Sequence, residues 1–516
     1  MSTRRYLVSI ALLLGIACGT PAKRERTAQD LIKFVEGTSV FGPAKEWLAS
    51  DLPDVAATGL FPTRTPSECA VAILPGGEDS FSVRMELLAR AKQTIRIQAL
   101  IYTGDESGLR VAEVLKQKKQ QGVDVKVIID GVNNPSLQTQ WMYFDLKQHG
   151  IEVEGYEALG LQLANEIPIP LVTPLYDPAL PNKRYHEKLW IIDAGTPHAE
   201  AVVGGLNIAN EYFRVDPGNV PRYWRDQDVV VRGAVLADLT TTFDRNFDHF
   251  KDLKRRRGGL TDAAWTATRE IMAKTGTPPI TFERRDDLVR TVAQLEARKP
   301  ALTWQPTQCR FLQSRPRLRE SYIQQAYLKL LDSARDEVLI GNAYFVPTYS
   351  LRLAIAKAAR RCVRIVLLSN GPETNDTPGM SLLGRGYYSE LLAVNARAEV
   401  KACPKKAGVE VWEWQGKASA DQRQTQGLYH AKYAVVDRKV ALVGSYNLDP
   451  RSERHNSETA LVFEQDALAQ ELAKLYERDL STSRQIDATE AFTFEKPESV
   501  RQRFAKDLAG LFEDQM

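Results

Sequence analysis

Several residue types and patterns are scarce in this chain of 516 residues, and each scarcity excludes a class of protein. The sequence contains only six histidines and five cysteines, with no CxxC or HExxH pattern, so the common zinc-binding motifs are missing. Lysine and arginine number 68 and aspartate and glutamate 65, which gives a net charge of +3. Dedicated nucleic-acid-binding proteins usually have an obvious basic excess, and this chain lacks one.

The apolar run near the N-terminus, Tyr6 to Ile16, is too short to span a membrane, because a spanning helix needs about 20 residues. Two arginines precede it and small residues follow it, which is typical of a secretory signal. Residues 1–18 are therefore predicted to be a signal peptide. Its end at Cys18 resembles a bacterial lipoprotein signal, in which that cysteine is lipidated, although Gly15 stands where leucine is usual. An ordinary cleaved signal and an uncleaved anchor remain alternatives.

A lipoprotein signal predicts an extracytoplasmic, membrane-anchored protein on the periplasmic face or cell envelope. Such a compartment permits disulfides among Cys69, Cys309, Cys362 and Cys403. Four cysteines allow three pairings, between which the sequence does not choose. Since Cys362 opens the apolar run 363–368, we expect it to be a buried free thiol.

An internal repeat divides the chain into two similar halves. A single core rarely exceeds about 250–300 residues, so a chain of this length is expected to hold two domains. Residues 91–102 are similar in pattern to residues 334–345. Each segment is predicted to contain a helix end, a charged turn and an apolar strand. Residues 185–193 match 429–437 at nearly the same offset. The halves should therefore share a fold and face each other across a pseudo-twofold axis.

Continuous apolar strands alternate with helices in each half, which is typical of a sheet buried on both faces. We predict an α/β fold of two homologous domains, each a mixed, mostly parallel sheet with helices on both faces. The predicted segments are an N-terminal lead over 19–65, domain one over 66–255, a helical linker over 256–308 and domain two over 309–516. The basic run 254–257 is interpreted as a solvated helix face or linker, with contact to anionic phospholipid as the alternative.

Both halves carry the same series of reactive side chains. The members are His186, Lys188, Asp193, Gly205 and Asn207 in the first half, and His430, Lys432, Asp437, Ser445 and Asn447 in the second. Ten residues separate the aspartate from the glycine pair in the first copy, against six before Gly-Ser in the second. The extra residues lie in the turn-rich stretch 194–200, where insertion is tolerated.

The spacing of these residues favours chemistry at phosphorus. Residues i and i+2 of a strand share one face, so each histidine points into a cavity together with its lysine. Imidazole can attack phosphorus or transfer a proton near neutral pH, and an ammonium group offsets phosphate charge. A Gly-Gly or Gly-Ser turn lets the amide of Asn207 or Asn447 approach phosphate oxygens closely.

The pattern HxKx4Dx6G[GS]xN, present twice, is similar to the signature of the phospholipase D superfamily. Residues 444–452 resemble bacterial cardiolipin synthases, the C type above all, as do 369–370 and 374–376. The resemblance covers residues 70–516 in layout and is strong around the motifs. It implies one site between the halves, where one histidine forms a covalent phosphoenzyme and the other protonates the leaving alcohol. It also implies that His186 is the nucleophile and His430 the acid/base, with no metal or other cofactor.

The resemblance further implies a carboxylate after each motif that orients the imidazole of that motif. Glu458 fits this role in the second copy, and Asp226 is preferred over Asp228 in the first. A structural role is expected for Asp193, Asp437, Gly205 and Ser445.

The expected function is phosphatidyl transfer from a glycerophospholipid such as phosphatidylglycerol, at a membrane surface. A second phosphatidylglycerol as acceptor would give cardiolipin, and water would make the enzyme a phospholipase D. One alternative is a secreted nuclease-type phosphodiesterase of the same superfamily, although the balanced charge argues against nucleic acid as a partner. The other is a catalytically silent scaffolding lipoprotein, although no motif position is lost. The sequence identifies no protein partner.

Overall fold

The computed structural model describes residues 67–156, 184–216, 223–257, 260–276, 281–316, 320–416 and 427–494. The predicted signal peptide, Cys18 and the N-terminal lead lie outside these residues. Within the described ranges, no helix is both long and apolar enough to cross a membrane.

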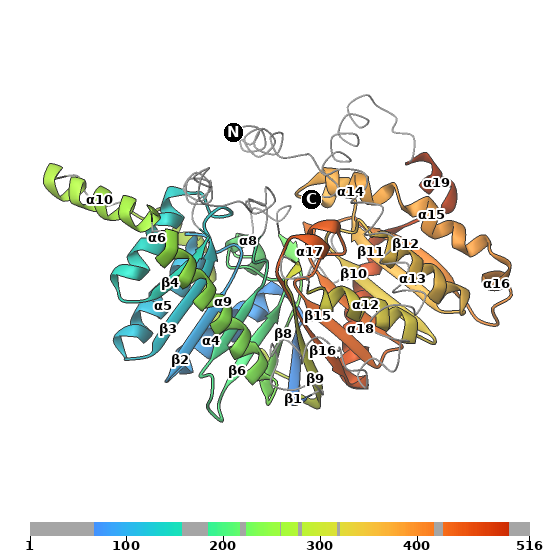
Figure 1. Ribbon diagram of the computed structural model, residues 1–516, viewed down its shortest axis with the longest axis horizontal. Helices are drawn as coiled ribbons and strands as arrows, with labels where there is room; N and C mark the ends of the chain where they lie inside the picture. Colours follow the sequence, from blue (N-terminus) through green and yellow to red (C-terminus); the bar gives the residue numbers. More distant parts are fainter. Residues whose placement is uncertain are drawn as a thin grey trace.

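One mixed sheet of 15 strands runs through both halves of the molecule, in the order β17-β12-β11-β10-β14-β15-β16-β9-β1-β8-β6-β5-β2-β3-β4 (Figure 1). The strands of the first half are β1 (Ser67–Leu74), β2 (Thr94–Gln98), β3 (Asp124–Asp130), β4 (Glu152–Tyr156), β5 (Leu189–Ile192), β6 (Glu200–Gly204) and β8 (Asp228–Gly233). Those of the second half are β9 (Gln305–Ser314), β10 (Glu337–Asn342), β11 (Arg364–Asn370), β12 (Gly408–Trp414), β14 (Lys432–Val436), β15 (Val440–Gly444), β16 (Glu458–Glu464) and β17 (Ser483–Ile486).

The strand order repeats from one half to the other. The series β4-β3-β2-β5-β6-β8-β1 corresponds to β12-β11-β10-β14-β15-β16-β9, and β17 adds an edge strand to the second half. Strands β1 and β9 pair antiparallel at the centre, so that the two half-sheets are continuous. Two short strands, β7 (Trp224–Arg225) and β13 (Leu428–Tyr429), form a separate parallel pair that joins one half to the other.

The expected α/β class with two related halves is confirmed, and the pairing of the strands adds detail. Parallel pairing in the large sheet is limited to β2-β3-β4 and β10-β11-β12, and its other pairs are antiparallel. The sheet is thus more antiparallel than expected. The reason is local, because the motif strands form hairpins, β5–β6 and β14–β15, whereas parallel neighbours need a crossover helix.

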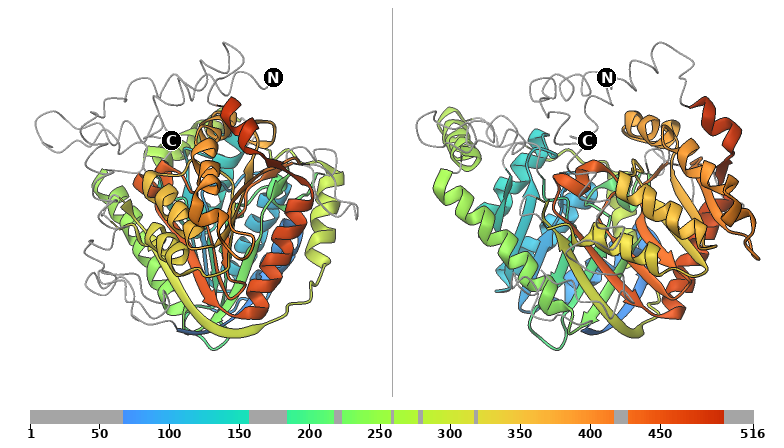
Figure 2. Two further views of the ribbon diagram at one scale, coloured as in Figure 1. Left: turned by 90° about the vertical axis from the view of Figure 1, so that its right-hand side faces the viewer. Right: turned by 45° about the vertical axis from the view of Figure 1, so that its right-hand side comes forward.

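Helices cover both faces of the sheet (Figure 2). They are α4 (Gly77–Arg90), α5 (Glu106–Gln120), α6 (Leu137–Gln148), α8 (Asn210–Phe213), α9 (Leu236–Arg257), α10 (Leu260–Thr275), α11 (Asp286–Ala297), α12 (Tyr322–Ser333), α13 (Tyr349–Arg360), α14 (Pro378–Arg385), α15 (Tyr388–Ala393), α16 (Ala398–Lys401), α17 (Pro450–Arg454), α18 (Asp466–Ser481) and α19 (Ala488–Thr493), with 3-10 turns η4 (Pro372–Thr374) and η5 (Val394–Ala396). Helices α10 and α11 fall in the predicted linker, and α10 projects away from the first half (Figure 1). Enclosed in this way, β5, β14 and β15 are buried almost throughout, as their apolar runs predict.

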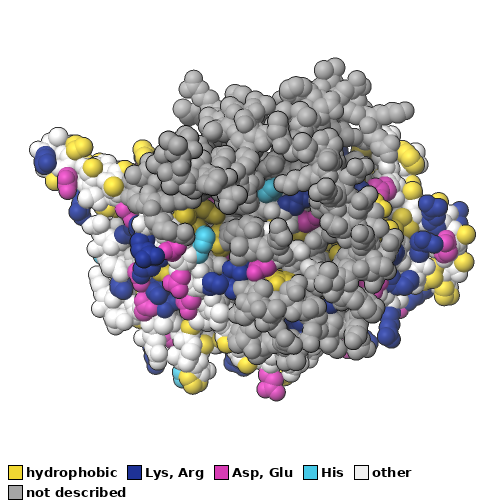
Figure 3. Space-filling model, in the orientation of Figure 1, with side chains coloured by type: hydrophobic (Ala, Val, Ile, Leu, Met, Phe, Trp, Pro, Cys, Tyr) yellow, Lys and Arg dark blue, Asp and Glu magenta, His cyan; other side chains and the backbone are white. Residues whose placement is uncertain are grey.

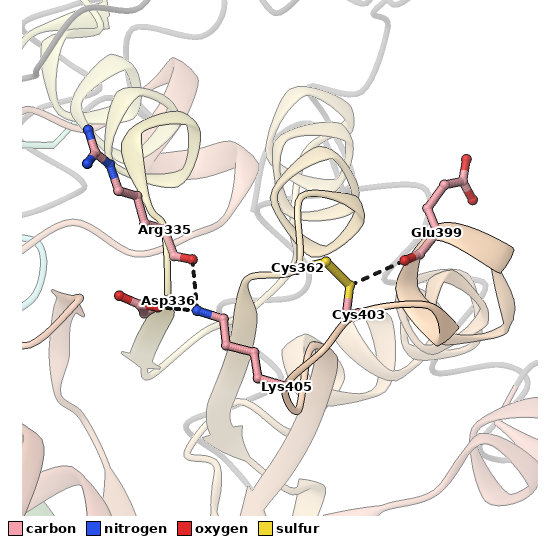
Figure 4. Close-up of a disulfide and its surroundings, with 6 residues drawn as sticks. All are labelled: Arg335, Asp336, Cys362, Glu399, Cys403 and Lys405. Carbon is pink, nitrogen blue, oxygen red and sulfur yellow. Dashed lines mark hydrogen bonds and ion pairs between the residues drawn. A yellow bond between two sulfur atoms is a disulfide. The ribbon is translucent and has the colours of Figure 1, made fainter.

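Two disulfides join segments that are distant in sequence. Cys69–Cys309 connects β1 to β9 where the half-sheets meet, and Cys362–Cys403 connects the turn before β11 to the segment after α16 (Figure 4). The expectation that Cys362 is a free thiol is therefore wrong. The residue lies in a left-handed turn with φ of 70° and is only half-buried, so its side chain reaches Cys403 instead of the core.

Acidic and basic side chains are intermingled on the described part of the face drawn in Figure 3. The basic run at the end of α9 follows this pattern. Lys254 lies 3.7 Å from Glu154 and also contacts Asp262, and Arg255 lies 2.6 Å from Asp252. These contacts fit the interpretation of the run as a solvated helix face.

Candidate active site

The two His-x-Lys motifs stand at corresponding positions of the two halves, at the entry to β5 and to β14. The Lys188 ammonium donates a hydrogen bond to the His186 carbonyl at 2.5 Å, and Lys432 makes the same contact with His430. All four side chains are buried. Burial is the largest cause that lowers the pKa of each histidine. The charge of Lys432 also lowers the pKa of His186, and the charge of Lys188 also lowers that of His430. The motifs therefore share one site between the halves.

The backbone attaches each motif to the opposite half. The amide of His186 donates to the Ser457 carbonyl at 2.8 Å, beside a parallel bridge between Tyr185 and Ser457. The amide of His430 donates to the Arg225 carbonyl, also at 2.8 Å, next to the β7–β13 pair. Each motif therefore lies directly beside the residue that precedes the carboxylate of the other half.

Because of this attachment, each carboxylate contacts the histidine of the opposite half. His186 Nδ1 lies 2.8 Å from Glu458 Oε2, and His430 Nδ1 lies 2.8 Å from Asp226 Oδ2. The expectation that each carboxylate orients the histidine of its own half is wrong, because the strand carrying the carboxylate pairs across the interface. Both carboxylates are nevertheless those predicted, and Asp228 instead pairs with Arg84 at 2.7 Å. In each pair Nδ1 is occupied, which leaves Nε2 as the reactive nitrogen.

The two carboxylates differ in how many hydrogen bonds they accept. Glu458 accepts from the Ser445 hydroxyl at 2.6 Å, the Ser452 hydroxyl at 2.8 Å and the Asn456 amide at 3.3 Å, besides His186. Hydrogen bonds to an ionised carboxylate stabilise that form. The second half therefore supplies its own carboxylate with three neutral donors.

The equivalent positions of the first half supply no such donors to Asp226. Gly205 takes the place of Ser445, and a Cβ at Gly205 would lie 2.3 Å from Asp226 Oδ2. Tyr212 and Trp224, which take the places of Ser452 and Asn456, pack their rings against His430 at centroid distances of 5.3 and 4.8 Å. Apart from its contact with His430, the Asp226 carboxyl group accepts one hydrogen bond, from the backbone amide of Gln227 at 2.8 Å.

The pKa values of the carboxyl groups follow these surroundings. Burial alone would raise the pKa of Glu458, but the His186 imidazole, Lys188 and the Ser445 hydroxyl outweigh it and hold the pKa below its usual value. Burial raises the pKa of Asp226 to about 8, against the opposing charge of Lys432. Near neutral pH, Glu458 is thus ionised and Asp226 holds a proton.

The two histidines consequently differ in the protonation of Nε2, the nitrogen that points into the site. Burial lowers the pKa of His186 to about 4 and that of His430 well below its usual value, so both rings are neutral near pH 7. His186 donates its Nδ1 proton to the ionised Glu458 and keeps a lone pair on Nε2. Asp226, being protonated, donates to His430 Nδ1, so the ring proton of His430 resides on Nε2. At Nε2, one ring therefore presents a lone pair and the other a proton.

The lysines and asparagines provide for a bound anion. Burial lowers the pKa of Lys188 to about 7 and that of Lys432 to about 8, and an anionic phosphate in the site would favour their charged forms. The Asn207 side-chain oxygen accepts from the amide of Ile101 at 3.1 Å, which leaves its NH2 group as a donor. Within the described residues, the buried side-chain oxygen of Asn447 has no hydrogen-bond partner.

The motif aspartates lie away from this chemistry. Asp193 accepts hydrogen bonds from three successive backbone amides, Lys92 to Thr94, at 2.7–3.2 Å. Asp437 does the same for Arg335 to Glu337 at 2.8–2.9 Å. Each aspartate ties the end of its motif strand to the turn before β2 or β10.

Four residues that shape the site, Ser452, Asn456, Tyr212 and Trp224, were not among the predicted site residues. The sequence does contain a signal for them. Matching Asn207 to Asn447 aligns Tyr212 with Ser452, and matching Asp226 to Glu458 aligns Trp224 with Asn456, so the two copies differ at these positions. The four residues are not shared between the copies, so the repeat itself does not single them out. The described ranges hold no group of three His, Cys, Asp or Glu side chains placed to bind a metal ion.

Comparison with known proteins gives matches for both halves. A family model described as "Cardiolipin synthase, PLD-like domain" matches residues 85–250 and 327–480, inside the two predicted domains. The cardiolipin synthase of Geobacillus thermodenitrificans (strain NG80-2) is 26% identical over 388 residues, which are 75% of this chain and 61% of that protein. The major cardiolipin synthase ClsA of Bacillus subtilis (strain 168) is 26% identical over 428 residues, covering 83% of this chain and 71% of the relative. The chain therefore spans less than two thirds of the first of these relatives.

Among solved structures, a phosphatidylserine synthase from Haemophilus influenzae Rd KW20 has a similar fold. Its TM-score is 0.57 at 17% identity, and the match covers 86% of this chain and 95% of the other. At this identity the likeness concerns the fold alone.

Proposed function

Because the chain belongs to the family described as cardiolipin synthase, PLD-like domain, we propose that it is a phosphatidyltransferase or phosphodiesterase acting on glycerophospholipids. The favoured reaction cleaves a lipid such as phosphatidylglycerol and passes its phosphatidyl group to an acceptor. A second phosphatidylglycerol as acceptor gives cardiolipin, and water gives phosphatidic acid. The observation that carries the proposal is the pair of crossed contacts, His186 with Glu458 and His430 with Asp226, which prepare two unlike histidines for one site.

In the first step, the lone pair on His186 Nε2 attacks phosphorus and forms an N–P bond. The bond between phosphorus and the head-group oxygen breaks, and that oxygen takes the proton from His430 Nε2. Asp226 passes its own proton to His430 Nδ1, so no bare alkoxide has to leave. The ionised Glu458 offsets the positive charge that develops on the His186 ring.

In the second step, the same groups act in reverse. His430 Nε2 takes a proton from water or from an acceptor hydroxyl, whose oxygen attacks phosphorus. The N–P bond breaks and His186 returns to its neutral form. Throughout both steps, Lys188, Lys432 and the two asparagine amides stabilise the charge on the non-bridging phosphate oxygens.

Localisation outside the cytoplasm belongs to the same proposal. Its support is the pair of disulfides, Cys69–Cys309 and Cys362–Cys403, since such bonds persist in oxidising compartments and are rare in the cytosol. The predicted lipid anchor at Cys18 would hold the enzyme at a membrane surface that contains its substrate.

The test is a product assay with the full-length chain in mixed micelles of phosphatidylglycerol and detergent, with a chelator present. Lipids are followed by mass spectrometry for the wild type and for His186→Ala and His430→Ala. We expect cardiolipin or phosphatidic acid from the wild type only, and the product identifies the acceptor. Unchanged lipids in the presence of cleaved DNA or RNA would favour the nuclease-type phosphodiesterase. Full biological activity of both variants would favour the silent scaffold.

A further inference from the structure

A carboxylate–phenol pair lies in the second half at the edge where β10 and β11 end. Asp376 belongs to the loop between η4 and α14, and Tyr344 is the second residue after the end of β10. The Tyr344 hydroxyl donates to Asp376 Oδ1 at 2.5 Å. The Asp376 side chain is exposed and the Tyr344 ring is half-buried, so the pair faces outward with its carboxylate accessible.

This pair lies on the His430 side of the site. Phe345, the residue after Tyr344, pairs with Leu448, the residue after the motif residue Asn447. Tyr212, whose ring packs against His430, also interacts electrostatically with Asp376 and with Tyr344. Burial is the main cause of the low pKa of Lys432, and Asp376 is among the carboxylates that oppose it. Asp376 is therefore close to the group that protonates the leaving alcohol, although it contacts neither motif histidine directly.

Among the described residues of the first half, the equivalent positions carry no such pair. The bridges of Tyr102 with Ile208 and of Phe345 with Leu448 align the two halves and place Ile101 opposite Tyr344. At the position equivalent to Asp376, counted from the ends of β3 and β11, stands Ser136, which caps α6 by accepting from the Thr139 amide. The two sides of the site thus differ in their chemistry.

The protonation states determine which side receives the head group. The leaving oxygen must lie next to His430 Nε2, because that nitrogen carries the proton. The head group attached to this oxygen then extends on the His430 side, and the diacylglycerol part remains towards His186. During transfer, the incoming acceptor occupies the same place by microscopic reversibility.

Building on the proposed function, we propose that Asp376, held by Tyr344, is a specificity residue that accepts hydrogen bonds from the hydroxyl groups of a polyol head group. Desolvation by the surrounding protein raises the pKa of Asp376, against the hydrogen bond from Tyr344 and the charge of Lys432. In its ionised form the carboxylate has about four lone-pair positions, and Tyr344 uses one of those on Oδ1. Hydroxyl groups suit the remaining positions better than an ammonium group does, because Lys432 lies close enough to repel a second cation. The same carboxylate disfavours an anionic head group.

The test compares phosphatidylglycerol, whose head group carries two free hydroxyls, with phosphatidylcholine, which has no donor. Bis(p-nitrophenyl) phosphate serves as a phosphodiester without a polyol. For Asp376→Asn, we expect kcat/KM for phosphatidylglycerol to fall roughly 10- to 100-fold, because a hydrogen bond to a charged group is lost. Turnover of the other two substrates should change by less than about threefold. Tyr344→Phe should show a smaller loss with the same selectivity, since the carboxylate remains but is no longer held.

The matched control is Glu373→Gln, which removes an exposed carboxylate from η4, three residues before Asp376, and should leave all three substrates unchanged. Equal losses on all three substrates for Asp376→Asn would overturn the head-group assignment and leave the phosphohistidine chemistry in place. So would a wild type that prefers phosphatidylcholine, an outcome that needs no variant. A wild type that turns over none of the three substrates would instead count against the proposed function itself.

Discussion

Glu458 lies 2.8 Å from Nδ1 of His186, a histidine 272 positions earlier in the chain. Its counterpart, Asp226, makes the corresponding contact with His430, 204 positions later. The contacts are similar in length but differ in their surroundings, because three neutral donors surround Glu458 and two aromatic rings pack beside the other pair. The distinct roles proposed for the two histidines rest on this difference.

The covalent intermediate should form on His186. We expect His186→Ala to lose activity by roughly four to six orders of magnitude, because no nucleophile remains. In His430→Ala, an activated ester such as bis(p-nitrophenyl) phosphate needs no proton for its leaving group, so the phosphoenzyme should form and persist. Intact-protein mass spectrometry and peptide mapping after an acid-free quench measure this. An adduct on His430 in the His186→Ala variant would reverse the assignment.

The rate should depend on pH as a bell-shaped curve. Activity should rise through about pH 4, because His186 must be neutral to attack. It should fall through about pH 8, because Asp226 loses the proton that keeps His430 Nε2 protonated, and Lys188 and Lys432 lose charge between about 7 and 8. The measurement is kcat/KM between about pH 3 and 10 with a substrate whose leaving group needs protonation. With an activated leaving group the Asp226 contribution should disappear. A flat profile from pH 5 to 9 for the first substrate would contradict the paired-histidine mechanism.

Removing the hydroxyl groups that donate hydrogen bonds to Glu458 should shift the acidic side of the pH–rate curve. Ser445→Ala and Ser452→Ala each remove a hydrogen bond to the carboxylate, worth about 1.5–3 kcal/mol, and should therefore raise the pKa of Glu458. Because Glu458 must be ionised, the acid limb should shift to higher pH while the rate at pH 7–8 changes less. Ser333→Ala removes a hydroxyl that bonds only to the Leu330 carbonyl, and serves as the control. A uniform loss of rate with no shift of the limb would indicate a purely structural role for the serines.

The disulfide at the centre of the sheet should matter most for folding stability. Cys69–Cys309 closes a loop of 240 residues between β1 and β9, so Cys69→Ser with Cys309→Ser should lower the free energy of unfolding by about 2–5 kcal/mol. The Cys362–Cys403 bond closes only 41 residues, and its removal should cost less in the same chain-entropy terms. Thermal unfolding of both double variants, with and without reductant, tests the order. Variants as stable as the oxidised wild type would remove this support for folding in an oxidising compartment.

The sequence predicts the duplicated part of the fold and site and misses what depends on contacts between the halves. Matching motif spacing was enough to identify His186, Lys188, His430 and Lys432, which the structure brings together. It also identified both carboxylates. It assigned them to the wrong histidines, because pairing of Tyr185 with Ser457 across the interface leaves no periodic pattern in the chain.

Cys362 shows the same limit on a smaller scale. The apolar run after it predicts a strand correctly, but one residue of left-handed turn before β11 directs its side chain outward to Cys403. The unlike surroundings of the two histidines were, by contrast, readable in principle. They require comparison of the copies for their differences, such as Gly205 against Ser445, and not only for what they share.

Because each carboxylate contacts the histidine of the other half, an assembly made from one half alone would have two identical histidine–carboxylate pairs. A twofold assembly of the first half alone would carry two aspartate pairs, both holding a proton, and would have two acids but no ready nucleophile. An assembly of the second half alone would have two nucleophiles and no acid. A single chain that contains both copies lets the two pairs diverge independently, so the covalent fusion of the halves supports the division of labour proposed for Glu458 and Asp226.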